Sequence, residues 1–188
     1  IEALDKQTAP RLFKAFQSVA QVYRSGGFRV RYVLMDGQFD SLRGDMANMQ
    51  ELLNPTARDE HVGDIERYIR TIKERMRSTY NTVPFGTMPS RMVIELANRS
   101  VFWLNAFPAR DGISTTLSPR TILTSQTINH DRHCSYDFGE YVQTHEEHDN
   151  SMAPRTVGAL AMRPTGNAQG SYYFFSLDTG RIINRLRA

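Results

Sequence analysis

The sequence predicts a mixed α/β chain that ends in a small all-β module. Before about residue 128, apolar residues recur every three or four positions, which is the period of an amphipathic helix. One strand, at residues 28–35, interrupts these helices. After Asn129 the period changes to two, which is typical of strands. We therefore expect an α/β domain over residues 1–128 and an all-β module over residues 136–188.

The composition excludes several classes of protein. The 188 residues are 40% hydrophobic and 23% charged, which is the balance of a globular chain. No run approaches the ~20 apolar residues that a membrane-spanning helix needs, so we expect no membrane partner. The single cysteine, Cys134, excludes an internal disulfide and predicts a reducing, intracellular compartment. The chain starts at Ile1 without a secretory signal and stops at Ala188 while its residue pattern still continues. We therefore expect a fragment of a longer protein that is not secreted.

The charge is mildly basic. There are 23 Lys and Arg residues against 20 Asp and Glu residues, which gives a net charge of +3 and a pI near 9.2. Only Lys6, Lys14 and Lys73 are lysines, and the planar guanidinium of the other cations suits bidentate contacts with phosphate. This composition is compatible with nucleic-acid binding but does not predict it alone.

The first part of the chain predicts helices around a single strand. Gly26 and Gly27 end the first helix, and Ser118 with Pro119 forms a cap that opens the last one. In the strand, the unbroken apolar run 33–35 predicts burial on both faces. The helices are expected over residues 8–24, 45–53, 62–80, 89–105 and 119–125.

The helix at residues 62–80 has two parallel stripes. Its apolar stripe should be buried, and the polar stripe lies one residue further round the helix. The apolar stripe consists of Ile65, Ile69, Ile72 and Met76, and the polar stripe of Glu66, Arg70, Lys73 and Arg77.

The last part of the chain predicts four short strands, at residues 140–144, 156–162, 171–177 and 181–186. Residues 164–170 and 178–180 supply turns between them, and residues 145–154 form a polar link. Four strands in so short a stretch indicate a small barrel or a meander.

Asp36 and Glu66 are the candidate catalytic residues. Asp36 follows the buried strand and Glu66 lies in the first turn of a helix, and rigid elements of this kind can fix carboxylates around two Mg²⁺ ions. The neighbouring cations Arg67, Arg70, Lys73 and Arg77 would then contact DNA phosphates. The alternative is a surface pair of Glu66 with Arg70 and an ordinary turn aspartate.

A second group of residues could be interpreted as a zinc site. Two His-x-x-His pairs and one cysteine occur close together in the sequence. Scattered loop histidines are the more frequent outcome, so we expect no zinc. The group consists of His130, His133, Cys134, His145 and His148. The aromatic residues Phe102, Trp103 and Phe107 are expected in the core.

Seven segments occur in an order that is typical of one family. VLMDGQF at 33–39 places an aspartate after a strand, HVGDIERYIRT at 61–71 begins a helix with a glutamate, and WLNAFP at 103–108 ends a buried helix. The others are SPRTI at 118–122, FG at 138–139, APR at 153–155 and GSY at 170–172. Together they resemble the integrase of copia-type LTR retrotransposons, in the retroviral-integrase branch of the ribonuclease-H-like superfamily.

The resemblance implies a truncated ribonuclease-H-like core over residues 1–128 and an SH3-like module over residues 136–188. It implies DNA integration by polynucleotidyl transfer with Mg²⁺ or Mn²⁺, with Asp36 and Glu66 as catalytic metal ligands. It further implies DNA as partner, a homo-oligomer in the intact protein, a nuclear location or a cytoplasmic particle, and no small-molecule substrate.

The chain also departs from the family. Gly37, Gln38 and Ile69 replace the usual Asn, Glu and Asn. The first catalytic aspartate is missing, because Asp5 is too close to Asp36 and lies at the start of a helix. We therefore expect poor metal affinity and no strand transfer by this chain alone. The alternatives are a non-catalytic DNA-binding or assembly module derived from a retroelement, and a nuclease of the same superfamily.

Overall fold

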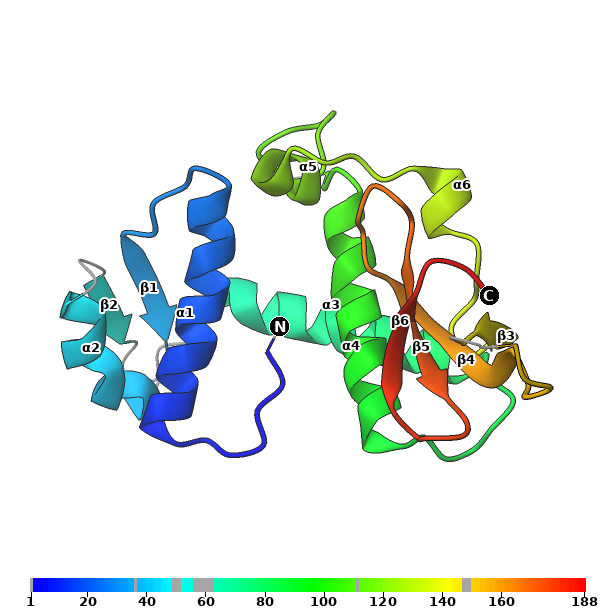
Figure 1. Cartoon of the computed structure of the whole chain (residues 1–188). Helices are drawn as coiled ribbons and strands as arrows, with labels where there is room; N and C mark the ends of the chain where they lie inside the picture. Colours follow the sequence, from blue (N-terminus) through cyan, green and yellow to red (C-terminus); the bar gives the residue numbers. More distant parts are fainter. Residues whose placement is uncertain (1, 36, 49–51, 56–62, 111, 147–149) are drawn as a thin grey trace.

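A computed structural model of the chain describes residues 2–35, 37–48, 52–55, 63–110, 112–146 and 150–188. It contains a parallel pair of strands near the N-terminus and a four-stranded antiparallel sheet near the C-terminus. Figure 1 shows these two sheets at opposite ends of the molecule, with helices α3 and α4 between them. The structure therefore confirms that the chain is a mixture of helices and sheets.

Helix α1 (Ala9–Ser25) begins and ends where its sequence signals predict. Pro10 lies in the first turn, where its missing N–H costs no hydrogen bond, and Gly26 follows the last residue. An ideal Cβ on Gly26 would lie 2.2 Å from the carbonyl oxygen of Leu123. The end of α1 therefore touches helix α5 (Pro119–Thr124) at a point where only glycine fits.

The two parallel strands enclose a short helical connection. Strand β1 (Tyr32–Met35) pairs with β2 (Leu52–Pro55), and between them lie the 3-10 helix η1 (Gly37–Leu42) and helix α2 (Arg43–Asn48). Leu42 and Met46 are fully buried in this connection. The result is a small β-helix-β unit.

Two predictions about this unit are wrong. The helix expected over residues 45–53 stops at Asn48, and residues 52–53 belong to β2, because a short apolar run suits a strand as well as a helix. The strand expected from residue 28 starts at Tyr32, and it is not buried on both faces: Leu34 is 53% exposed. Among the described residues β1 pairs with one strand only, and its second face has no covering layer.

Helices α3 (Gly63–Tyr80) and α4 (Ser90–Ala106) confirm two further predicted helices. They cross at a steep angle, so α4 covers only part of α3 (Figure 1). Ile72 and Met76 are half-buried, whereas Ile65 and Ile69 are exposed. The prediction of a buried stripe therefore holds for the C-terminal half of α3 and is wrong for the N-terminal half.

The C-terminal sheet is a meander in the order β3-β4-β5-β6. It confirms the four predicted strands, and it follows helix α6 (His130–His133), which was not among the predicted helices. The strands are β3 (Tyr141–His145), β4 (Thr156–Pro164), β5 (Tyr172–Ser176) and β6 (Ile182–Arg185).

Both faces of this sheet carry buried side chains. On one face, Met92 and Leu96 of α4 pack with Phe138, Met162 and Phe175. On the other face, the buried cluster consists of Ala159, Ala161, Tyr172 and Phe174. The predicted division at residues 128–136 stays a prediction, and the hydrophobic core of α4 and the sheet spans it.

Helix α4 is less buried than its composition predicts. Met92 and Leu96 face the sheet, but Val93 and Ile94 are exposed. No helix in the described ranges is both long and apolar enough to cross a membrane.

Candidate nucleic-acid interface

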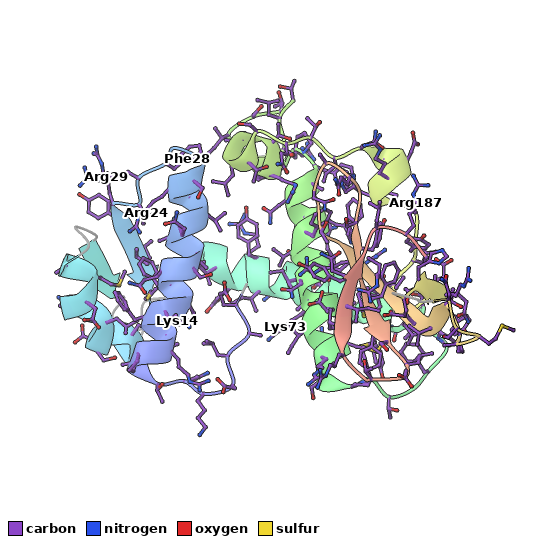
Figure 2. The ribbon with its side chains drawn as sticks, in the orientation of Figure 1. Lys14, Arg24, Phe28, Arg29, Lys73 and Arg187 are labelled. Carbon is purple, nitrogen blue, oxygen red and sulfur yellow. The ribbon has the colours of Figure 1, made fainter. Side chains whose placement is uncertain are left out.

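The predicted cations lie together on the exposed surface of α3. The sequence of this helix holds five Arg or Lys residues and three Asp or Glu residues. The helical repeat places the four predicted phosphate ligands within an arc of about 120° and over a length of about 15 Å. All four side chains are exposed: Arg67, Arg70, Lys73 and Arg77. In Figure 2, Lys73 lies on the part of the molecule between the two sheets.

Only one of the two predicted catalytic carboxylates falls within the described residues. Glu66 is exposed in the first turn of α3, four residues before Arg70 and on the same face. Asp36 lies outside the described residues, so the predicted proximity of Asp36 and Glu66 stays a prediction.

The described residues do not form a site that fits a pair of divalent cations. Across these residues, no group of three or more His, Cys, Asp or Glu side chains could hold a metal ion. The face of α3 around Glu66 is cationic, with Arg70 and Lys73, which disfavours a dication beside it.

The histidines and the cysteine considered as a zinc site do not gather at one place among the described residues. His133 is buried, and its Nδ1 lies 2.7 Å from the carbonyl oxygen and 3.2 Å from the backbone nitrogen of Asn129. Its Nε2 lies 2.9 Å from the Asn167 carbonyl oxygen. His133 therefore joins α6 to the turn between β4 and β5. His148 lies outside the described residues.

Cys134 directly follows His133. Cys134 is exposed, yet partial burial raises the pKa of its thiol. The charge of the nearby Arg99 opposes this shift. A raised pKa makes the thiol a weaker nucleophile at neutral pH.

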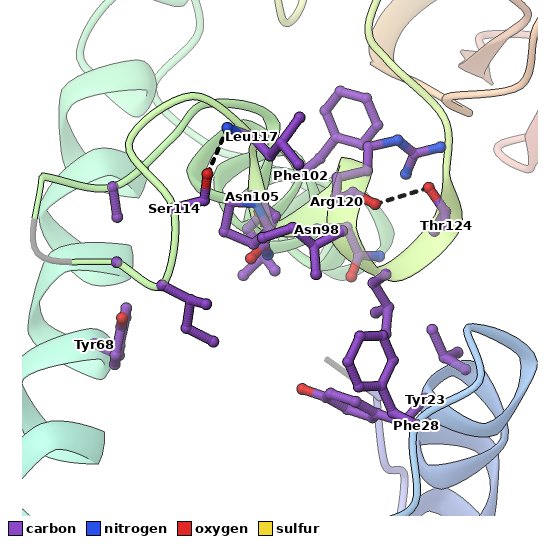
Figure 3. Close-up of a pocket in the computed structure, with 18 of the residues that line it drawn as sticks. Tyr23, Phe28, Tyr68, Asn98, Phe102, Asn105, Ser114, Leu117, Arg120 and Thr124 are labelled. Carbon is purple, nitrogen blue, oxygen red and sulfur yellow. Dashed lines mark hydrogen bonds between the residues drawn. The ribbon is translucent and has the colours of Figure 1, made fainter.

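A cavity of about 670 Å³ lies between α1, α3, α4 and α5. Four aromatic side chains from separate elements line it: Tyr23, Phe28, Tyr68 and Phe102. Figure 3 shows Tyr68 on one side of the open space and Tyr23 with Phe28 on the other. No local pattern predicts it, because its walls come from segments that are distant in the sequence.

The aromatic residues of α4 are not all in the core. Phe102 is half-buried beside the cavity and meets Trp103 edge-to-face, with their centroids 5.0 Å apart. Phe107 is 53% exposed, so its predicted core position is wrong. It lies just past the end of α4, where helix packing no longer covers it.

Two guanidinium groups line the cavity. Arg163 is paired with Glu95, whereas Arg120 donates to the carbonyl oxygen of Gly166 over 2.6 Å and lies over Phe102 at 5.2 Å. Burial lowers the pKa of Arg120, and its Nε is buried without a partner among the described residues. No Asp or Glu occurs among the described lining residues.

No protein-family model matches the chain, and no curated protein matches it either.

Proposed function

We propose that this chain is a DNA-binding part of a retroelement integrase, and that α3 contacts the phosphate backbone. The observation that carries the proposal is the exposure of Arg67, Arg70, Lys73 and Arg77 along one face of α3. Four cations on a rigid helix can neutralise successive phosphates, and this contact is the main source of affinity for DNA.

The finer fold is part of the same proposal. Residues 1–128 would be a truncated ribonuclease-H-like core, and the parallel β1–β2 pair with its helical connection is compatible with such a core. Residues 136–188 would be an SH3-like module, and the four-stranded meander with two buried faces supports this assignment.

In the intact protein, Asp36 and Glu66 would belong to the Mg²⁺ or Mn²⁺ site of a polynucleotidyl transferase. That protein would act as a homo-oligomer on DNA, in the nucleus or in a cytoplasmic particle. These statements rest on the resemblance of the sequence segments described above.

A second candidate is a non-catalytic DNA-binding or assembly module derived from a retroelement. The cationic surroundings of Glu66 favour it, because phosphate binding needs no carboxylate pair. The two candidates share the DNA contact on α3. They differ in that only the first belongs to a protein that catalyses polynucleotidyl transfer.

Fluorescence anisotropy with a labelled DNA duplex tests the shared contact. Because each lost phosphate contact lowers the slope of log affinity against log salt by about 0.9, replacing the four α3 cations by Gln should reduce the slope by up to about 3.6. The matched control replaces four exposed cations elsewhere: Lys6, Arg110, Arg155 and Arg187.

We expect the α3 variant to lose most of its affinity and the control variant to lose little. Equal losses in both variants would show that net charge alone attracts DNA. Absence of salt-dependent binding by the unmodified chain would end the proposal.

A further inference from the structure

The cavity between α1, α3, α4 and α5 has ring side chains on two sides. Tyr68 is 60% exposed, and Tyr23 and Phe28 are each 44% exposed, so a large part of each residue is in contact with solvent. Figure 3 shows Tyr68 across the open space from Tyr23 and Phe28. A flat apolar molecule between these rings would gain contact with them and would leave water.

The rest of the wall and the volume suit the same kind of molecule. About 670 Å³ is within the range of small-molecule sites, which apolar side chains line together with a few polar groups that fix the orientation of the ligand. The aliphatic part of the wall comes from α1, α4, α5 and the loop before α5, and it includes Val22, Val101, Leu117, Ile122 and Leu123.

The two guanidinium groups that line the cavity are engaged by other parts of the protein. Arg163 pairs with Glu95. Arg120 donates to the carbonyl oxygen of Gly166 over 2.6 Å and lies over the ring of Phe102. In Figure 3 the guanidinium of Arg120 points away from Tyr68. Both cations therefore hold protein segments together, and a ligand need not carry a charge to meet them.

The polar groups that remain for a ligand are two neutral amides on α4. Asn98 and Asn105 are seven residues apart, which places them on one face of the helix. Asn98 Nδ2 donates to Glu95 over 3.3 Å, and Asn105 Nδ2 donates to the Val101 carbonyl oxygen over 2.9 Å. Within the described part of the chain, the Oδ1 atom of each amide forms no hydrogen bond. Each amide therefore retains an acceptor and a second N–H.

We propose that this cavity binds a flat, neutral, aromatic molecule that carries an amide-like hydrogen-bonding group. The resemblance described above implies no small-molecule substrate, and the proposal concerns binding without a chemical step. It is independent of the proposed function, because Tyr68 lies about 140–180° round α3 from the cations Arg70, Lys73 and Arg77. The cavity and the DNA contact are therefore on different sides of this helix.

Trp103 provides a readout inside the protein. It is the only tryptophan of the chain, and its ring centroid lies 5.0 Å from that of Phe102, which lines the cavity. The neutral dye N-phenyl-1-naphthylamine absorbs light where tryptophan emits, so a bound dye should quench Trp103 by energy transfer. We expect saturable quenching by one dye molecule per chain. Quenching that does not saturate would overturn the proposal, because the dye would then adsorb to exposed apolar surface in general.

Displacement of the dye by three molecules with the same ring system tests the class of ligand. Naphthalene is apolar, 2-naphthamide adds a neutral amide, and 2-naphthoate adds a negative charge. We expect 2-naphthamide to bind about 2- to 12-fold more tightly than naphthalene, which is the range for one net hydrogen bond, and also more tightly than 2-naphthoate. Equal affinity for naphthalene and 2-naphthamide, or tighter binding of 2-naphthoate, would contradict the proposed chemistry.

Variants of the wall locate the site. Tyr68→Ala and Phe28→Ala should each weaken binding of the dye by about 2- to 12-fold, which is the range for the loss of one aromatic contact. The double variant Asn98→Leu with Asn105→Leu should bind naphthalene but lose the preference for 2-naphthamide. The matched control is Tyr32→Ala, since Tyr32 is 69% exposed on β1, does not line the cavity and should not affect binding. Unchanged binding in both aromatic variants would place the ligand elsewhere and end the proposal.

Discussion

Arg163 and Glu95 join the C-terminal sheet to helix α4. Arg163 Nε on β4 donates to Glu95 Oε2 over 2.6 Å, and the guanidinium lies 4.3 Å from the centroid of the Tyr173 ring. The two side chains are only 20% and 10% exposed. This ion pair therefore crosses the interface between α4 and β4 in a largely dry environment, where its loss leaves a charge without compensation.

Replacing Glu95 by Ala should lower the free energy of unfolding by about 2–4 kcal/mol, because Arg163 would remain half-buried without its partner. Urea denaturation followed by circular dichroism measures the change. The double variant Glu95→Leu with Arg163→Met should lose less than the single variant, since neither charge remains. A double variant that is less stable than Glu95→Ala would contradict this account.

Two glycines should respond in opposite directions to substitution by alanine. Gly26→Ala places a methyl group against the Leu123 carbonyl oxygen, where an ideal Cβ would lie at 2.2 Å, and should destabilise the chain by about 1–3 kcal/mol. Gly44→Ala in α2 has no heavy atom within 4 Å and should stabilise it by about 0.5–1 kcal/mol. Thermal unfolding of both variants tests the contact between α1 and α5, and equal shifts would contradict it.

The stability of the chain should fall as the pH rises above about 10. Burial raises the pKa of Tyr172 above its ordinary value of 10.0, and the hydrogen bond from the Ser135 N–H to its hydroxyl oxygen partly opposes this shift. The unfolded chain therefore loses this proton at lower pH than the folded chain, and ionisation favours unfolding.

Tyr172→Phe removes the titrating group. This variant should be less stable at neutral pH, because the Ser135 N–H loses its 2.9 Å acceptor, and its stability should decline less steeply in alkali. Urea titrations from about pH 8 to 11 compare the two slopes. Identical slopes would show that Tyr172 does not cause the alkaline loss.

Residues 1–188 alone should show no metal-dependent nicking or joining of DNA. Asp36 and Glu66 carry two charges against the four of two divalent cations, and the face of α3 around Glu66 adds cations of its own. Plasmid nicking with Mg²⁺ or Mn²⁺ measures this, with Asp36→Asn and Glu66→Gln as controls. A product that requires metal and disappears in Asp36→Asn would contradict the expectation.

Much of the helical part could be predicted, because its signals are local. The Ser118 hydroxyl accepts a hydrogen bond from the Thr121 N–H over 3.1 Å, as its position before Pro119 predicts. The four cations of α3 were found because helical spacing alone places them on one face. Periodicity shows which face of a helix is apolar, but not whether another element covers it, so the exposure of Ile65 and Ile69 was missed.

The cavity and the buried ion pair depend on the tertiary arrangement. Glu95 and Arg163 are 68 positions apart, and nothing near either residue in the sequence indicates the other. Phe28 and Phe102 likewise meet the same cavity from different elements. Such long-range relationships arise from tertiary packing, which composition and spacing along the sequence do not predict.

The hydrophobic core shared by α4 and the meander determines how the chain can be shortened. Met92 and Leu96 are 1% and 3% exposed because Met162 and Phe175 cover them. A truncation that stops before β3 would expose the side chains of Met92 and Leu96 to water. A piece that starts at β3 would expose the face of the sheet that packs against them. Coexpression of the two halves on separate plasmids should therefore yield more soluble material than either half alone, through reassembly across the same surface.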